Sequence, residues 1–257
     1  MKVILLQFVL IPFALSAFSY ARGAENRYDV WARTIAPISK LFVSSGPNRA
    51  ARAEFTLEAL TGAPPEVLGK RLNFAIQPPD RLRLSGEIMN QKITLCRDQQ
   101  RVWAAPGRNF QTLLSNFGPL PKPEPGFAMG KFRVPFSMDQ IGLLPALFIV
   151  QERTGEDVDG VPCRVLDLKL MPELAQNLKA QAWWARLWVT PDFKPARLRL
   201  AQPGWEIVLG IRNVKYLPVI PERQWRPIGE SDVYFFNSDR LSQFMQLIKQ
   251  KLNGGGW

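Results

Sequence analysis

Two cysteines, Cys96 and Cys163, carry the most reactive side chains in this 257-residue sequence. Each lies in a segment that reads as a β-strand. In an oxidising compartment they could form a disulfide, which would stabilise the fold by up to about 4 kcal/mol. The alternative is two buried free thiols on strands that are not neighbours. Neither is expected to be a catalytic nucleophile, because the sequence contains no histidine that could activate a thiol.

The lack of histidine also excludes Ser-His-Asp sites and histidine-ligated metals. No phosphate-binding glycine motif of the GxxxxGK[ST] or GxGxxG type occurs. The sparse acidic residues fall mostly at turns, where turn chemistry explains them better than the facing carboxylates of a glycosidase; these are Asp80, Asp98, Asp157, Asp159 and Asp192. The sequence therefore predicts no catalytic residue, no metal site and no cofactor.

The chain is basic, with 33 Lys and Arg against 22 Asp and Glu and a formal net charge of +11. The basic residues are spread singly rather than in runs. This pattern favours solubility or contact with a membrane surface over binding of nucleic acid.

An apolar segment without charges runs from Val3 to Ala21, directly after Lys2. It ends in the small residues of Ser19–Ala21, which resemble a signal-peptidase site. We expect a cleaved signal peptide over residues 1–23, export to the periplasm, and a single domain over residues 24–257. The alternative is a membrane anchor of nearly bilayer-spanning length, against which Gln7 and Pro12 argue.

Alternation of apolar and polar residues predicts two groups of short antiparallel strands. The first group comprises residues 52–60, 67–77, 81–88, 92–97 and 101–105, and the second comprises 161–170, 182–190, 196–201 and 205–216. Helices are expected over 28–42, where Pro37 should kink or end the helix, and over 109–117, 172–180 and part of 137–150, with an amphipathic helix over 239–252 capped by Ser238. The fold class is therefore mainly β (α+β), with helices over one apolar sheet face.

One short pattern, P-x-R-L-R-L, occurs twice, at Pro79–Leu84 and Pro195–Leu200. The simpler interpretation is two strands that each leave a proline turn and alternate. The other is a cationic stripe on the outer sheet face, which could contact anionic lipid headgroups.

Several segments, taken in order, resemble the LolA/LolB-like superfamily of bacterial periplasmic lipoprotein carriers. The resemblance covers roughly Arg52 to Tyr216 and is carried by Pro79–Leu84, Leu95–Asp98, Arg101–Trp103, Asp159–Leu166, and Leu187–Thr190 with Pro195–Arg197. The chain departs from the family pattern at Gln99-Gln100, which stands where the family usually has a glycine. The helix over 239–252 lies outside the shared part.

The resemblance implies an open, curved antiparallel sheet, a half-barrel, with helices over its concave face and an apolar cavity between them. The candidate cavity-lining residues are Phe74, Leu84, Leu144 and Phe148. Each of them could equally belong to a packed core.

The function implied is a periplasmic binding or carrier protein, which holds a lipid or lipoprotein acyl chain for transfer between membranes without covalent chemistry. Its partners would be that acyl chain and a membrane surface or envelope protein. One alternative is a sensor, similar to the lipid- or peptide-reading part of periplasmic stress regulators, with the 239–252 helix as its docking element. Another is an enzyme that acts on exported polymers.

Overall fold

The computed structural model describes residues 26–42, 47–63, 65–99, 101–116, 118–123, 144–229 and 231–252. The expected signal peptide lies outside these residues, as does the part of the predicted 137–150 helix that precedes Leu144. No helix among the described residues combines the length and apolar composition needed to cross a bilayer.

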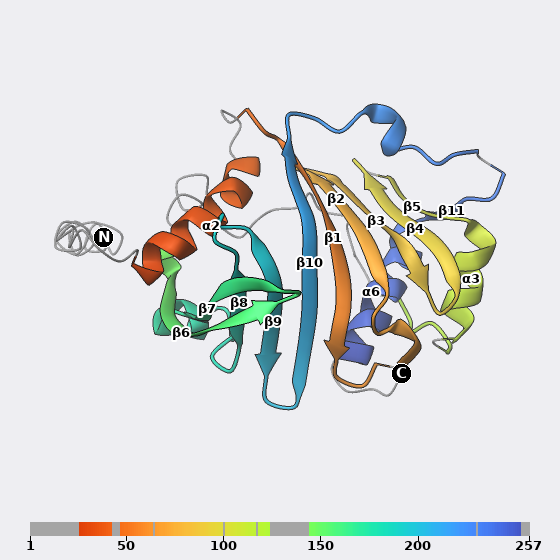
Figure 1. The fold of residues 1–257 in the computed structure, drawn as a ribbon. Coiled ribbons are helices and arrows are strands. Elements are labelled where there is room, and N and C mark those ends of the chain that lie inside the picture. Colours follow the sequence, from red (N-terminus) through yellow and green to blue (C-terminus); the bar gives the residue numbers. More distant parts are fainter. Residues whose placement is uncertain are drawn as a thin grey trace, which may run out of the picture.

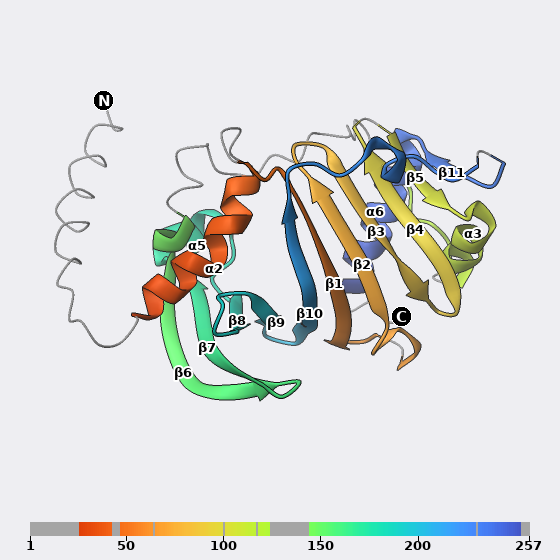
Figure 2. The same cartoon turned by 45° about the horizontal axis from the view of Figure 1, so that its top comes forward.

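The described residues form one antiparallel sheet of 11 strands in the order β11-β5-β4-β3-β2-β1-β10-β9-β8-β7-β6 (Figure 1). The strands are β1 (Ala50–Leu60), β2 (Arg71–Gln77), β3 (Arg81–Ile88), β4 (Gln91–Asp98), β5 (Arg101–Ala105), β6 (Phe148–Val158), β7 (Val161–Leu170), β8 (Trp184–Val189), β9 (Pro195–Gln202), β10 (Trp205–Leu217) and β11 (Tyr234–Phe236). The sheet is open, with β11 and β6 at its edges, and it twists and curves across its width (Figure 2). This confirms the expected fold class.

Two meanders, β1–β5 and β6–β10, meet where β1 pairs with β10. Within each meander, neighbouring strands follow one another in sequence, mostly through short turns, with η1 (Pro65–Val67) between β1 and β2 and a short helix between β7 and β8. Asp159 and Gly160 between β6 and β7 both have positive φ, at 54° and 78°. Such a pair fits the two-residue hairpin turn that matches the twist of antiparallel strands.

Helices cover one face of the sheet, called here the inner face. At the β6–β8 side, α2 (Arg27–Leu41) buries Val30 and Trp31 against Val150, Leu166 and Leu187. At the other side, α3 (Gly107–Asn116) packs on β4, β5 and β11 around Ile93, Ala104, Phe110 and Leu113, and Phe244 of α6 (Ser238–Leu252) packs against this cluster. From there α6 passes behind β3 and β2 toward β1 (Figures 1 and 2). Figures 1 and 2 show α2 at one end of the sheet and α3 at the other. The inner face is therefore buried at both flanks.

The segment 144–158 differs from the prediction. A short 3-10 helix, η2, spans Leu144–Leu147, and β6 begins at Phe148, where a helix was expected to continue to Val150. Most of β6 is polar and exposed, because it pairs with β7 alone at the edge of the sheet. An exposed edge strand lacks the apolar alternation on which the strand predictions relied.

Two expectations about helix ends were wrong. Helix α2 does not end at Pro37 but continues to Leu41, and the burial of Val30, Trp31 and Leu41 offsets the backbone hydrogen bond that the proline removes. Helix α6 is capped by Asn237, whose Oδ1 accepts a hydrogen bond from the backbone N–H of Arg240 at 2.8 Å, rather than by Ser238. Near the expected 172–180 helix, the structure has the shorter α5 (Pro172–Asn177).

The segment Pro218–Pro227, called here the strap, crosses the outer face of the sheet between β10 and β11. It contains the 3-10 helix η3 (Glu222–Gln224). Ile220 and Trp225 are 1% and 0% exposed and pack with Cys96 and Trp103. The strap therefore gives the outer face a small core of its own.

Candidate functional site

A strip of half-buried apolar side chains lies along the inner face of the middle strands, where Figures 1 and 2 show α6 passing behind β3 and β2. The strand registers place these side chains on one face. The strip comprises Phe55, Leu57, Leu72, Phe74, Ile76, Leu82, Leu84, Leu198, Leu200, Leu209 and Ile211, none of which reaches full burial. An apolar surface of this extent inside a sheet is the kind of surface that binds an apolar ligand or is covered by further packing.

Of the four predicted cavity residues, two lie side by side and a third lies elsewhere on the sheet. Phe74 and Leu84 are direct cross-strand partners on β2 and β3 and belong to the apolar strip. Phe148 lies on edge strand β6, where its ring packs edge-on against Trp31 at 5.4 Å between centroids. Leu144 is the first residue of η2, and its side chain is not among those that the structure describes. Two residues that the sequence assigned to one site, Phe74 and Leu84, are thus neighbours in the sheet.

The two cysteines are free and buried, so of the two alternatives the structure has the buried free thiols and not the disulfide. Cys96 lies on β4 and Cys163 on β7, with β3, β2, β1, β10, β9 and β8 between them. Neighbouring strands lie about 4.8 Å apart, so this separation far exceeds the span of a disulfide. Burial raises the pKa of Cys96 to about 12, and it also raises the pKa of Cys163.

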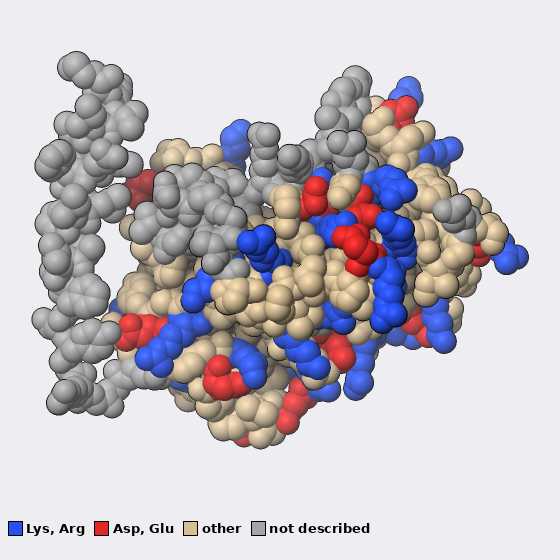
Figure 3. Space-filling model, turned by 90° about the horizontal axis from the view of Figure 1, so that it is seen from above, with Lys and Arg blue, Asp and Glu red and all other residues tan. Residues whose placement is uncertain are grey.

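The repeated P-x-R-L-R-L segments form the start of β3 and β9. Their leucines point to the inner face and their arginines to the outer face, as the alternation predicts. Most of the outer arginines are neutralised by carboxylates: Arg81 by Asp98 and Glu222, Arg197 by Glu58, Arg199 by Glu206, Arg186 by Asp167 and Arg212 by Asp159. At the upper end of the molecule as well, basic and acidic side chains are interspersed (Figure 3). Because of these ion pairs, the outer face does not carry an unbroken cationic stripe.

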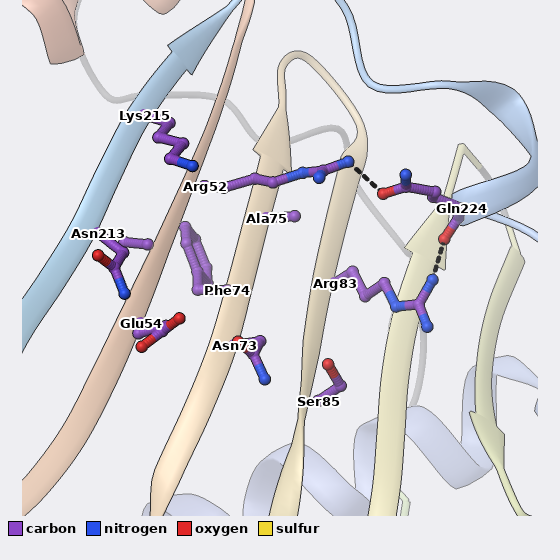
Figure 4. Close-up of a pocket in the computed structure, with 11 residues that line it drawn as sticks. Arg52, Glu54, Asn73, Phe74, Ala75, Arg83, Ser85, Asn213, Lys215 and Gln224 are labelled. Carbon is purple, nitrogen blue, oxygen red and sulfur yellow. Dashed lines mark hydrogen bonds between the residues drawn. The ribbon is translucent and has the colours of Figure 1, made fainter.

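One hollow on the outer face, called here the outer pocket, has a volume of about 600 Å³ and lies between the strap and the middle strands. It is lined by Arg52, Ala53, Glu54, Asn73, Phe74, Ala75, Arg83, Ser85, Asn213, Lys215 and Gln224. Figure 4 shows Arg52 and Arg83 both extending toward Gln224 of the strap. The Nη2 of Arg52 donates to Oε1 of Gln224, and the Nη1 of Arg83 donates to the main-chain oxygen of Gln224.

The outer pocket differs from the rest of the outer face in its charge balance. Among the described residues, Arg52, Arg83 and Lys215 have no carboxylate partner, whereas Arg81 and Arg197 nearby are paired. Each guanidinium in the pocket is held by an amide or carbonyl oxygen, and Glu54 is the one carboxylate against three cations among the lining residues. No cluster of three or more potential metal-ligating side chains occurs within the described ranges.

Comparisons with known proteins give similarity at the level of structure. No family model matches the chain, and a search of curated proteins found no match. The solved structure of lipoprotein LppX from Mycobacterium tuberculosis is 9% identical, with 76% of this chain and 97% of LppX covered and a TM-score of 0.41. A LolA superfamily protein from Nitrosomonas europaea is 11% identical, with 76% and 96% covered and a TM-score of 0.30. MucB in complex with MucA is 12% identical, with 82% of this chain and 62% of MucB covered and a TM-score of 0.40.

One of these matched structures is a LolA superfamily protein. The fold class itself follows from the observed order and pairing of the strands in the open antiparallel sheet.

The residues of the outer pocket were missed by the sequence reasoning. Gln224 lies in the strap, which carries no strand or helix periodicity. Lys215 and Asn213 lie at a register shift between β1 and β10, and Asn213 has a positive φ of 54°. A single alternation pattern cannot show such a bulge, which changes the face on which side chains lie. Of its three cations, only Arg83 belongs to a pattern that the sequence showed, the repeated P-x-R-L-R-L segment.

Proposed function

We propose that this chain is an exported, non-enzymatic carrier protein that holds the acyl chain of a lipid or lipoprotein against the apolar strip. The observation that carries this proposal is that the strip stays half-buried although α6 passes behind it and the flanks on either side hold buried clusters. The sequence resemblance to LolA/LolB-like carriers agrees with it. A lipid bound there would lie along β1, β2 and β3 on the inner face.

Apolar burial supplies the driving force for such binding. Burial of one CH₂ group contributes about 0.8 kcal/mol, so a chain of about sixteen carbons would gain about 12 kcal/mol before ordering costs. Leaving a membrane costs the lipid a comparable amount. Transfer is then nearly balanced, and a partner at the membrane sets its direction.

Substitution of Leu84 tests this proposal. Leu84→Asp places a charge in the strip and should abolish uptake of a fluorescent fatty acid, and the milder Leu84→Ser should weaken it. Ser85→Asp is the matched control, since Ser85 is the next residue on β3 but lies on the outer face. Circular dichroism monitors the fold of all three variants.

Unchanged fatty-acid uptake in folded Leu84→Asp would overturn the proposal. Mass spectrometry of lipids extracted from the purified protein gives an independent measurement. A bound acyl species supports the carrier function, and recovery of an envelope protein without any lipid would favour the sensor instead.

Export through a cleaved signal peptide belongs to the same proposal. The mature chain should begin near residues 22–25, and the intact mass of periplasmic material measures this start. A chain that keeps residues 1–21 and remains with the membrane fraction would be an anchored protein.

A further inference from the structure

The strand registers align three unpaired cations in one row on the outer face. Lys215 on β10 stands opposite Arg52 on β1, Arg52 stands opposite Ala75 on β2, and Ala75 stands opposite Arg83 on β3. Like charges directly opposite each other on neighbouring strands are destabilising. The row therefore has an electrostatic cost that a bound anion would relieve.

Ala75 creates the space for such an anion. Its methyl side chain stands between Arg52 and Arg83, whose Cα atoms are two strand spacings apart, about 10 Å. A larger residue at this position would fill the hollow in which the two guanidinium groups converge. The strap closes one side of the hollow, because Gln224 accepts a hydrogen bond from each of these arginines.

The guanidinium groups are also held in place. One N–H of each is used by Gln224, and the other N–H groups of each planar fork remain available as donors. Arginine forks suit the several oxygens of a phosphate, and Lys215 adds a point charge from the facing strand.

The next row of the outer pocket is polar rather than cationic. Glu54 on β1 stands opposite Asn73 on β2, and Asn73 stands opposite Ser85 on β3. A carboxylate beside an amide and a hydroxyl can hydrogen-bond to the hydroxyl groups of a ligand. A phosphate ester that carries hydroxyl groups fits this arrangement, because its phosphate can contact the cations of one row and its hydroxyls the polar groups of the next.

We propose that the outer pocket is a binding site for a phosphate ester bearing hydroxyl groups, held by Arg52, Arg83 and Lys215. This ester can be the headgroup of a glycerophospholipid in a membrane or a free sugar- or glycerol-phosphate. The site lies on the face of the sheet opposite the apolar strip, so it is independent of acyl-chain binding.

Two binding assays distinguish the two sources of the phosphate ester. The first measures cosedimentation with phosphatidylcholine vesicles that contain phosphatidylglycerol, relative to vesicles without it. The second measures calorimetric titration with glycerol 3-phosphate. Binding in the first assay alone identifies a lipid headgroup, and binding in the second identifies a soluble ester.

Three variants test whether binding occurs in the outer pocket. Lys215→Gln and Ala75→Leu should each weaken binding by about tenfold or more, the first by removing a cation and the second by filling the hollow. Lys169→Gln is the matched control, because Lys169 is also an exposed lysine on the outer face but lies on β7, away from the pocket. Lys215 is exposed, so its substitution tests the site even where Ala75→Leu disturbs the fold.

Two results would overturn the proposal. One is equal weakening by Lys215→Gln and Lys169→Gln, which would mean that diffuse surface charge is responsible. The other is the absence of binding in both assays.

Discussion

Trp103 on β5 donates a hydrogen bond from its indole Nε1 to the main-chain carbonyl of Trp225 in the strap, at 3.2 Å. The same carbonyl accepts from the Sγ of Cys96 at 3.6 Å, and the indole of Trp225 donates to the carbonyl of Ile220 at 3.3 Å. The strap is thereby fixed to the sheet at its most buried residue. Gln224, the neighbour of Trp225, is held in the wall of the outer pocket by this attachment.

The first prediction concerns Trp225. Trp225→Ala should lower the free energy of unfolding by about 3–5 kcal/mol, because it removes the largest fully buried side chain and leaves a cavity. Trp225→Phe keeps most of the packing and should cost less. Urea denaturation measures both, and an unfolding midpoint of Trp225→Ala equal to that of the wild type would contradict the attachment of the strap.

The second prediction concerns Asp167, which is 8% exposed and lies between two arginines. Burial disfavours its ionised form, but hydrogen bonds from Arg186 and Arg153 outweigh burial and lower the pKa of Asp167. Its folded-state pKa therefore lies below the ordinary value near 3.9, so the pairing stabilises the protein above about pH 4 and is lost as the pH falls through the folded-state pKa.

Asp167→Asn should consequently cost about 1–3 kcal/mol of unfolding free energy at pH 7. The difference from wild type should shrink toward pH 2–3, where both chains lack the charge. Asp192→Asn is the control, because Asp192 and Lys194 form an exposed ion pair, and it should change stability much less. Urea denaturation at several pH values tests this, and a pH-independent effect of Asp167→Asn would refute it.

The third prediction concerns the thiols. Burial raises the pKa of Cys96 to about 12, with Asp98 raising it further and Arg83 and Arg81 opposing, so its thiolate is scarce at neutral pH. A maleimide reagent should label neither cysteine in the folded protein at pH 7.5 and both in denaturant. Val219→Cys adds a thiol at a position that is 59% exposed in the wild type and should be labelled at once. Failure to label in denaturant without a reductant would instead reveal a disulfide.

The fourth prediction concerns Pro37 inside α2. Pro37→Ala restores a backbone donor to the helix and removes the steric conflict of the ring with the preceding turn, so it should raise stability by about 1–3 kcal/mol. Thermal unfolding measures the change. Ser39→Ala in the same helix removes the side-chain hydrogen bond to the carbonyl of Ala36 and should not stabilise. A lower melting temperature for Pro37→Ala would mean that the ring itself is needed for packing.

Strands with one apolar face were predictable because burial imposes a period of two residues. The bounds of β3, β5 and β7 agree with those expected from alternation at Arg81–Ile88, Arg101–Ala105 and Val161–Leu170. Two edge strands, β6 and β11, were missed because edge strands need only one partner and tolerate polar or very short sequences.

The candidate sites were predictable only in part. Phe74 and Leu84 share a face of neighbouring strands, and local alternation shows that face directly. The row of Lys215, Arg52 and Arg83 depends on the pairing of β1 with β10 and on a bulge at Asn213. Contacts between distant segments and local shifts in register leave no periodic trace in the sequence, so this row could be found only in three dimensions.

The junction between β1 and β10 has a consequence for how the chain reaches its native state. Each meander consists of hairpins between sequence neighbours, which form rapidly from local contacts. The junction instead pairs residues as far apart as Ala50 and Leu217, and closing so long a loop is entropically costly. Two preformed half-sheets that dock along this single seam would make the seam the slow step of folding. The outer pocket, whose Lys215 and Arg52 come from opposite sides of the seam, would be completed only in that last step.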